Sequence, residues 1–260
     1  MMITVGKEVP LEDIEPRTGG GCTVVDLDRR RVRLDRAHLL ENSIVGLEHM
    51  DQRARTFILL RSQIMNGFYA SGGRILVVTS TQAGNGKTFV TANLACALSL
   101  IQPTMLVDLD LRRPTMADRF GLTVHAGIDD YLLGDCEWDD VGQKVAGYDL
   151  TLYPVREARK DSSTLLSLDR LPAAMRAVQS APFQPICIVD TPPALVLDDV
   201  MLISRNADGV LMVVEEGRTT SRDLKEAMRL IGPVPVVGTV LNKSITSGRF
   251  RYGYDYYDPA

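Results

Sequence analysis

Residues 81–88 have the sequence Thr-Gln-Ala-Gly-Asn-Gly-Lys-Thr, and they lie directly between an apolar run and a helix-forming run. Gly84 and Gly86 let consecutive backbone N–H groups turn toward one point, which the positive end of the following helix also faces. Lys87 supplies a point charge for phosphate groups, and the Thr88 hydroxyl is placed to ligate Mg²⁺. A glycine-containing turn that happens to precede a lysine is the alternative. The flanking strand and helix favour a phosphate-binding loop (P-loop), and hence a bound nucleotide.

From this loop onward, the sequence alternates apolar runs with helix-forming segments. Apolar runs without polar alternation, separated by helices, are typical of a parallel sheet that is covered on both faces. We therefore predict an α/β fold similar to that of P-loop NTPases, with a mostly parallel central sheet and helices on both faces. The expected strands are residues 74–79, 104–108, 150–154, 186–190, 209–214 and 235–241. The expected helices are residues 51–68, 87–101, 114–120, 163–180, 197–205 and 220–231.

Three segments are predicted along the 260 residues. Residues 1–50 contain a glycine triplet and a mixed-charge run but little periodicity, so we expect an N-terminal extension that is at best partly ordered. Residues 51–245 are expected to form the P-loop domain. Residues 246–260 abandon the strand–helix pattern and offer little for a core to bury, so a flexible tyrosine-rich tail is predicted.

Composition limits the partners and the location of the chain. The net charge is −4, which gives no overall basic field, so nucleic acid is not an expected partner. No apolar run reaches the roughly 18–20 residues that cross a bilayer, so no membrane span is expected. An acidic residue comes too early at the N-terminus for a secretory signal, which favours a cytoplasmic protein.

Acidic residues follow two of the predicted strands. Asp108 and Asp110 come after the run 104–107, and Asp190 ends the run at 186–189. Helix caps or surface charges are the alternative for the first pair. In P-loop folds an aspartate in the place of Asp190 holds Mg²⁺ directly or through water. Because ligands of parallel sheets bind at the carboxyl ends of the strands, these aspartates are expected to share one pocket with the P-loop.

Together these elements resemble the three Walker-type motifs of bacterial tyrosine autokinases, which partner polysaccharide copolymerases in capsule and exopolysaccharide export. The resemblance covers about residues 51–260, and the Asp-x-Asp-x-Arg element is its most discriminating part. Related ATPases that partition chromosomes or place division sites typically carry a second lysine early in the loop, where this chain has Gln82. The stretches that carry the resemblance are residues 81–88, 87–95, 105–112, 187–193, 238–243 and 252–257.

The resemblance implies an ATP-dependent protein-tyrosine autokinase that transfers the γ-phosphate of ATP to its own C-terminal tyrosines, with Mg²⁺ as the metal. It implies a role in regulating exopolysaccharide or capsule polymerisation and export. The implied partners are a homo-oligomer and the cytoplasmic tail of a membrane copolymerase or chain-length regulator, which would keep the chain at the inner face of the plasma membrane. The alternative function is a non-kinase ATP-binding switch or ATPase that assembles or gates an export complex.

The resemblance also assigns roles to single residues. Lys87 would neutralise phosphate charge, and Thr88 would bind Mg²⁺. Asp108 and Asp110 would hold the metal and orient or deprotonate the attacking tyrosine hydroxyl, and which of the two is the base stays open. Asp190 would complete the metal shell. The catalytic residues are thus expected to be Lys87, Asp108, Asp110 and Asp190, and the metal ligands Thr88, Asp110 and Asp190.

The remaining site residues leave alternatives open. Arg112 either contacts phosphate or stabilises its loop. Asn242 either contacts adenine, as the resemblance implies, or ends a strand in a plain turn. The expected cofactor-binding residues are Gly84, Asn85, Gly86, Lys87, Thr88, Phe89, Arg112 and Asn242. Four of the eight tyrosines lie in the last nine residues and are either phosphoacceptors or aromatic residues that pack on a neighbour: Tyr252, Tyr254, Tyr256 and Tyr257.

One pattern departs from the family. The helix before the P-loop commonly carries Glu-x-x-Arg-x-x-Arg in these kinases, and the aligned positions here are Arg55, Ile58 and Arg61. Only the last arginine is kept, which favours the nucleotide-switch alternative. The Asp-x-Asp-x-Arg element and the tyrosine tail favour the kinase.

Overall fold

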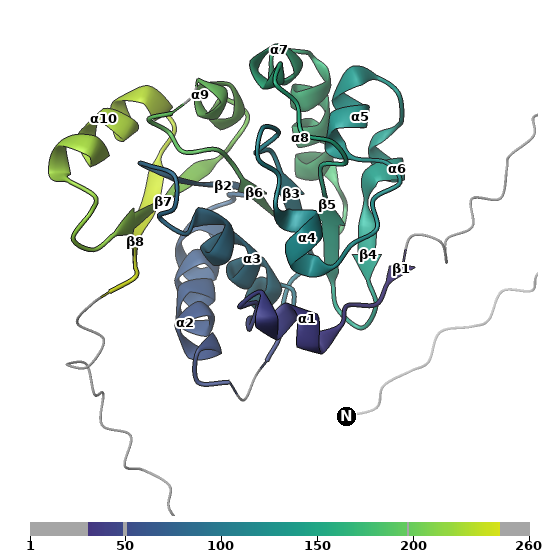
Figure 1. The fold of residues 1–260 in the computed structure, drawn as a ribbon, viewed down its shortest axis with the longest axis horizontal. Coiled ribbons are helices and arrows are strands. Elements are labelled where there is room, and N and C mark those ends of the chain that lie inside the picture. The colour runs from purple at the N-terminus through teal and green to yellow at the C-terminus, as the bar shows by residue number, and fades with distance from the viewer. Residues whose placement is uncertain (1–30, 49–50, 197, 245–260) are drawn as a thin grey trace, which may run out of the picture.

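The computed structural model describes residues 31–48, 51–196 and 198–244. They form an eight-stranded sheet in the order β1-β4-β5-β3-β6-β2-β7-β8, with helices packed on both of its faces (Figure 1). Strand β4 pairs antiparallel with β5, and the other neighbouring strands are parallel. The strands are β1 (Arg31–Val32), β2 (Ile75–Ser80), β3 (Thr104–Asp108), β4 (Gln143–Val145), β5 (Leu150–Tyr153), β6 (Ile186–Asp190), β7 (Gly209–Glu215) and β8 (Val236–Asn242).

The helices divide between the two faces of the sheet. Side chains alternate along a strand, so Leu76 and Val78 of β2 pack toward α1 to α4, whereas Ile75 and Val77 pack toward α5 and α7 to α10. The predicted class, a mostly parallel sheet with helices on both faces, is confirmed. The helices are α1 (Arg36–Glu41), α2 (Ala54–Ile64), the π-helix η2 (Met65–Tyr69), α3 (Lys87–Leu98), α4 (Met116–Phe120), α5 (Ile128–Leu133), α6 (Trp138–Val141), α7 (Ser162–Leu166), α8 (Arg170–Ser180), α9 (Asp199–Ser204) and α10 (Ser221–Ile231).

The helix predicted over residues 163–180 is instead two helices, α7 and α8. Pro172 lies in the first turn of α8, where its missing N–H is harmless. In one continuous helix Pro172 would lose a backbone hydrogen bond and collide with the preceding turn. The chain therefore turns between residues 167 and 169 and starts a new helix.

The segment before residue 50, expected as an extension, contributes β1 and α1 to the domain. The backbone N–H groups of Val45 and Gly46 donate to Oδ1 of Asn93 on α3, at 2.7 and 2.9 Å. The amide nitrogen of Asn93 donates to the carbonyl of Ser43 at 3.0 Å, and the Asn93 side chain is buried. A boundary at residue 50 therefore does not separate residues 31–48 from the body of the protein.

The order of the strands determines where the polar motifs meet. Strand β6 lies between β3 and β2, and the P-loop follows β2 directly. Asp108 and Asp190, the last residues of β3 and β6, are partners in the strand register. All three motifs therefore lie at the same edge of the sheet.

Candidate nucleotide and phosphoryl-transfer site

The loop between β2 and α3 has the backbone shape of a phosphate cradle. Gly84 and Gly86 have φ angles of 84° and 89°, in the left-handed region that residues with a side chain rarely adopt. A Cβ atom on Gly86 would also collide with the side-chain amide of Asn242. Helix α3 begins at Lys87, so its N-terminus points into the loop.

Asn85, expected among the cofactor-binding residues, uses its side chain to hold the loop. Its Oδ1 accepts from the backbone N–H of Gln82 at 2.9 Å, and its Nδ2 donates to Oε2 of Glu215 at 3.1 Å. The residue is 1% exposed. The side chain of Asn85 therefore supports the shape of the loop from within.

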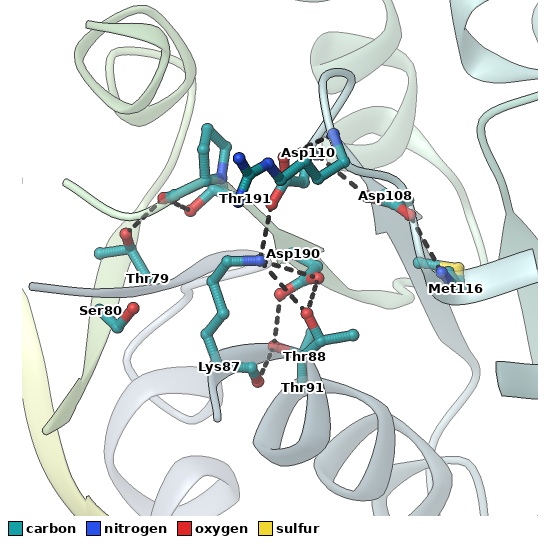
Figure 2. A network of polar contacts seen from close by, with 12 residues as sticks. Thr79, Ser80, Lys87, Thr88, Thr91, Asp108, Asp110, Met116, Asp190 and Thr191 are labelled. Atoms are coloured by element: carbon teal, nitrogen blue, oxygen red, sulfur yellow. Dashed lines mark hydrogen bonds and ion pairs between the residues drawn. The ribbon is translucent and has the colours of Figure 1, made fainter. Parts of the chain in front are cut away.

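Lys87 lies between two of the three aspartates (Figure 2). Its Nζ is 2.9 Å from Oδ2 of Asp110 and 3.6 Å from Oδ2 of Asp190. Burial alone lowers the pKa of Lys87, but the charges of Asp190 and Asp110 outweigh this effect and raise the pKa. Lys87 is thus held as a cation at neutral pH.

Asp190 is held by two hydroxyl groups of α3. Its Oδ2 accepts from Oγ1 of Thr88 at 2.7 Å, and its Oδ1 accepts from Oγ1 of Thr91 at 3.1 Å. Burial raises the pKa of Asp190, and the cation of Lys87 and the Thr88 hydroxyl offset part of that rise. Sequence analysis did not identify Thr91, although it lies one helical turn after Lys87 and Thr88 and so faces the same strand.

The two aspartates of the Asp-x-Asp-x-Arg element have different surroundings. Asp108 directs both carboxyl oxygens at backbone N–H groups, those of Asp110 at 3.0 Å and Met116 at 3.3 Å. Burial, and next the charge of Asp190, raise the pKa of Asp108 to about 8. Asp110 instead directs Oδ2 at Lys87. Asp108 therefore shapes the turn, and Asp110 faces the P-loop.

The raised pKa of Asp108 predicts a pH dependence of stability for the nucleotide-free protein. Its folded pKa of about 8 lies above the ordinary value near 4, so between about pH 5 and pH 8 the folded chain keeps a proton that the unfolded chain has released. The free energy of unfolding is then expected to fall as pH rises, by at most about 1.4 kcal/mol per pH unit for one proton. Urea denaturation across this range measures the slope. The Asp108→Asn variant should have a flatter slope, and an equal slope in both proteins contradicts the assignment.

A cavity of about 640 Å³ lies in front of the P-loop, a size typical of small-molecule sites. Lys87, Thr88 and Asp110 line it, whereas Asp190 lies behind Lys87 and Thr88 and is 1% exposed. Sequence analysis did not identify three cationic residues that line the cavity: Arg113, Arg119 and Lys243. Two of them directly follow predicted site residues, Arg113 after Arg112 and Lys243 after Asn242. The lining residues are Ala83, Gly84, Gly86, Lys87, Thr88, Phe89, Asp110, Arg112, Arg113, Thr115, Arg119, Pro192, Pro193, Val196 and Lys243.

Arg112 and Asn242 both support loops around this cavity. Nε of Arg112 donates to Oγ of Ser162 at 2.7 Å, while the side chain also lines the cavity. Nδ2 of Asn242 donates to the carbonyl of Asn85 at 2.9 Å and so supports the P-loop from the end of β8. The expected phosphoacceptors lie outside the described residues: Tyr252, Tyr254, Tyr256 and Tyr257.

The P-loop at the end of β2, with aspartates at the ends of β3 and β6, places the chain in the class of P-loop NTPase-like proteins. No family model matches the chain. EpsB of Ralstonia nicotianae is 30% identical over 203 residues, which are 75% of this chain and 26% of EpsB. The tyrosine-protein kinase Etk of Escherichia coli K12 is 28% identical over 198 residues, 75% of this chain and 27% of Etk. YwqD, a tyrosine-protein kinase of Bacillus subtilis, is 23% identical over 227 residues, 86% of this chain and 95% of YwqD.

The solved kinase domain of Escherichia coli ETK has the same fold, with a TM-score of 0.72 and 26% identity over 82% of this chain and 84% of that domain. The chain is therefore similar in sequence and in fold to bacterial tyrosine kinases. It spans about a quarter of the length of EpsB and Etk. Within residues 31–48, 51–196 and 198–244, no helix is long and apolar enough to cross a membrane.

Proposed function

We propose that this chain is a Mg²⁺- and ATP-dependent protein-tyrosine autokinase that transfers the γ-phosphate to its own C-terminal tyrosines. The observation that carries the proposal is the pairing of Lys87 of the P-loop with both Asp110, which faces the cavity, and the buried Asp190. The kinase names of Etk and YwqD support the same chemistry.

The residues present fit ATP and Mg²⁺. The left-handed glycines let the loop backbone take the shape of a phosphate cradle, and a Cβ on Gly86 would displace the Asn242 side chain that supports this loop. Thr88, Asp110 and Asp190 would supply hydroxyl and carboxylate oxygens, the donors that Mg²⁺ prefers. Within the described residues, no group of three or more His, Cys, Asp or Glu side chains forms a metal site by itself. Mg²⁺ commonly uses one or two carboxylates together with substrate phosphates, and it would supply charge neutralisation here.

The protein's own groups would then act by position and charge. Lys87 would exchange its carboxylate partners for phosphate oxygens, which releases Asp110. Asp110 would orient the tyrosine hydroxyl and hold its proton, because this carboxylate faces the cavity and Asp108 is bound to backbone N–H groups. Positioning and charge neutralisation account for most of the catalysis of phosphoryl transfer.

The second candidate is a nucleotide-dependent switch without kinase activity. It is favoured by Arg61, the one arginine kept from the family's helix pattern. NH1 of Arg61 donates to the carbonyl of Ala97 in the same chain at 3.1 Å. An arginine used within its own chain is less available for contacts with another subunit.

We further propose that the chain acts in exopolysaccharide or capsule polymerisation and export. The cytoplasmic tail of a membrane copolymerase would be its partner and would keep it at the inner face of the plasma membrane. A homo-oligomer would bring the tail of one copy to the site of another. These proposals rest on the motif resemblance.

One experiment separates the two candidates. Purified protein is incubated with Mg·ATP, with and without the cytoplasmic tail of a candidate copolymerase, and phosphotyrosine is mapped by mass spectrometry. The kinase predicts modified tyrosines among residues 252–257. Nucleotide binding without phosphotyrosine in either sample supports the switch.

Replacing all four tail tyrosines with phenylalanine is expected to reduce autophosphorylation to near background. The cavity is built from residues 83–243, so affinity for Mg·ATP should stay within about twofold of wild type. Calorimetry measures the affinity, and mass spectrometry measures the phosphotyrosine. Wild-type levels of phosphotyrosine in this variant would show that other tyrosines are the acceptors. The variant replaces Tyr252, Tyr254, Tyr256 and Tyr257.

A further inference from the structure

A buried carboxylate lies just outside the site described above. Asp199 begins α9 and is 0% exposed. Its Oδ2 accepts from Oγ of Ser162 and its Oδ1 from Oγ of Ser163, both at 2.7 Å. A charge this deeply buried is costly unless it is paired. The cation that pairs with it comes from the Asp-x-Asp-x-Arg element.

That cation is Arg112, and it reaches Asp199 through the hydroxyl of Ser162. Nε of Arg112 donates to Oγ of Ser162 at 2.7 Å and lies 3.8 Å from Oδ2 of Asp199. Ser162 gives its one hydroxyl proton to Asp199, so its oxygen is free to accept from Arg112. The three groups form a hydrogen-bond relay in one direction, from the guanidinium to the hydroxyl to the carboxylate.

This hydrogen-bond relay holds the guanidinium group only at Nε. Within residues 31–48, 51–196 and 198–244, the hydrogen bond and the ion pair of Arg112 both involve Nε and not the two terminal nitrogens. The side chain is 36% exposed and lines the cavity that contains Lys87 and Asp110. The backbone beside it is also fixed, because the N–H of Arg159 donates to the carbonyl of Leu111 at 2.7 Å.

We propose that Ser162 and Asp199 are positioning residues that orient Arg112 toward the phosphate end of the cavity. This inference rests on the proposed kinase function. A guanidinium fixed at Nε presents its planar fork to phosphate without first losing rotamer freedom. Hydrogen-bond donors lower the activation barrier when they are already oriented toward the charge that develops in the transition state. Asp199 thus makes Arg112 a phosphate ligand as well as a loop support.

The test is a double-mutant cycle on the full chain. It compares wild type, Asp199→Asn, Arg112→Ala and the double variant, using kcat and KM for ATP in autophosphorylation. Arg112→Ala is expected to lower kcat about 100-fold, as removal of a transition-state donor does. Asp199→Asn should lower kcat about tenfold in wild type and less than about twofold when Arg112 is absent. Equal losses in both backgrounds overturn the proposal.

A second variant separates positioning from folding. Ser163→Ala removes a partner of Asp199 that does not contact Arg112, so it should lower the unfolding temperature without lowering kcat. Ser162→Ala removes the hydroxyl that links Arg112 to Asp199, so it should reproduce the kcat loss of Asp199→Asn. If Ser163→Ala and Ser162→Ala lower kcat equally, the role is merely structural.

A second readout keeps this inference distinct from the kinase function. Calorimetry measures the affinities of the same proteins for Mg·ATP and Mg·ADP. Loss of preference for the triphosphate in Arg112→Ala and Asp199→Asn, but not in Ser163→Ala, supports the proposal even if wild type forms no phosphotyrosine. The absence of phosphotyrosine in wild type would contradict only the proposed kinase function. An unchanged preference in both variants, with no coupling in the cycle, overturns the inference while leaving an active kinase.

Discussion

The Lys87→Ala variant is expected to lose phosphoryl transfer completely and to bind Mg·ATP at least about 100-fold more weakly. Lys87 begins α3 at the P-loop, and its ammonium group lies between Asp110, which lines the cavity, and the buried Asp190. No other residue of the loop carries a positive charge. Calorimetry with Mg²⁺ present measures the affinity, and phosphotyrosine formation measures the transfer.

The control for this variant is Lys225→Ala, which removes an exposed lysine on α10 far along the chain from the P-loop. It should leave both affinity and transfer unchanged. Lys87→Ala should also remain folded, because the apolar clusters on both faces of the sheet do not include Lys87. An affinity for Mg·ATP equal to that of wild type would refute the assignment of the P-loop.

Loss of Lys87 should also change how the stability of the protein, measured without nucleotide, depends on pH. Burial raises the pKa of Asp190, and the cation of Lys87 opposes this rise because it favours the charged carboxylate. Without that cation the pKa of Asp190 rises further, and the folded chain keeps a proton to higher pH. Lys87→Ala should therefore be less stable relative to wild type at pH 8 than at pH 5.

The central strands could be predicted from the sequence because they are buried on both faces. Strand β2 is buried at each of its six positions, and its first four residues, 75–78, form a continuous apolar run. Strand β4 has three residues, and only Val145 is buried, so it leaves no run to detect. Helices α5 and α6 were also missed. Asp130 and Asp140 each accept from the backbone N–H three residues earlier, but the residues at those N-cap positions, Gly127 and Glu137, do not match the usual Ser/Thr-x-x-Glu/Gln capping pattern.

The site was predictable as far as strand ends determine it. Asp190 ends a buried strand, and the fold brings that end beside the P-loop. The different roles of Asp108 and Asp110 depend on how the chain turns after β3, which no residue pattern gives. The partners Ser162 and Asp199 lie 50 and 37 positions away from their contacts, so only the packing of α7 against α9 brings them together.

The Asp190→Asn variant is expected to lower Mg²⁺-dependent turnover by about 100- to 1,000-fold, or about 3–4 kcal/mol of transition-state stabilisation. The carboxylate holds the Thr88 hydroxyl at 2.7 Å and would complete the oxygen ligands of Mg²⁺. An amide can accept one of the hydrogen bonds from Thr88 and Thr91, but it carries no charge to attract the metal. Autophosphorylation rates over a range of Mg²⁺ concentrations measure the loss, which added Mg²⁺ should reduce only in part.

The Asp190→Asn substitution should lower activity without lowering the stability of the fold. Burial raises the pKa of Asp190, so its charged form is disfavoured in the protein without nucleotide or Mg²⁺, and a neutral amide removes that cost. The free energy of unfolding of Asp190→Asn at pH 8 should therefore match or exceed that of wild type. Thr91→Val is the matched control: it removes the 3.1 Å hydrogen bond to Asp190 but keeps the carboxylate, so turnover should fall less than about tenfold. Wild-type turnover in Asp190→Asn would show that this aspartate does not serve the metal.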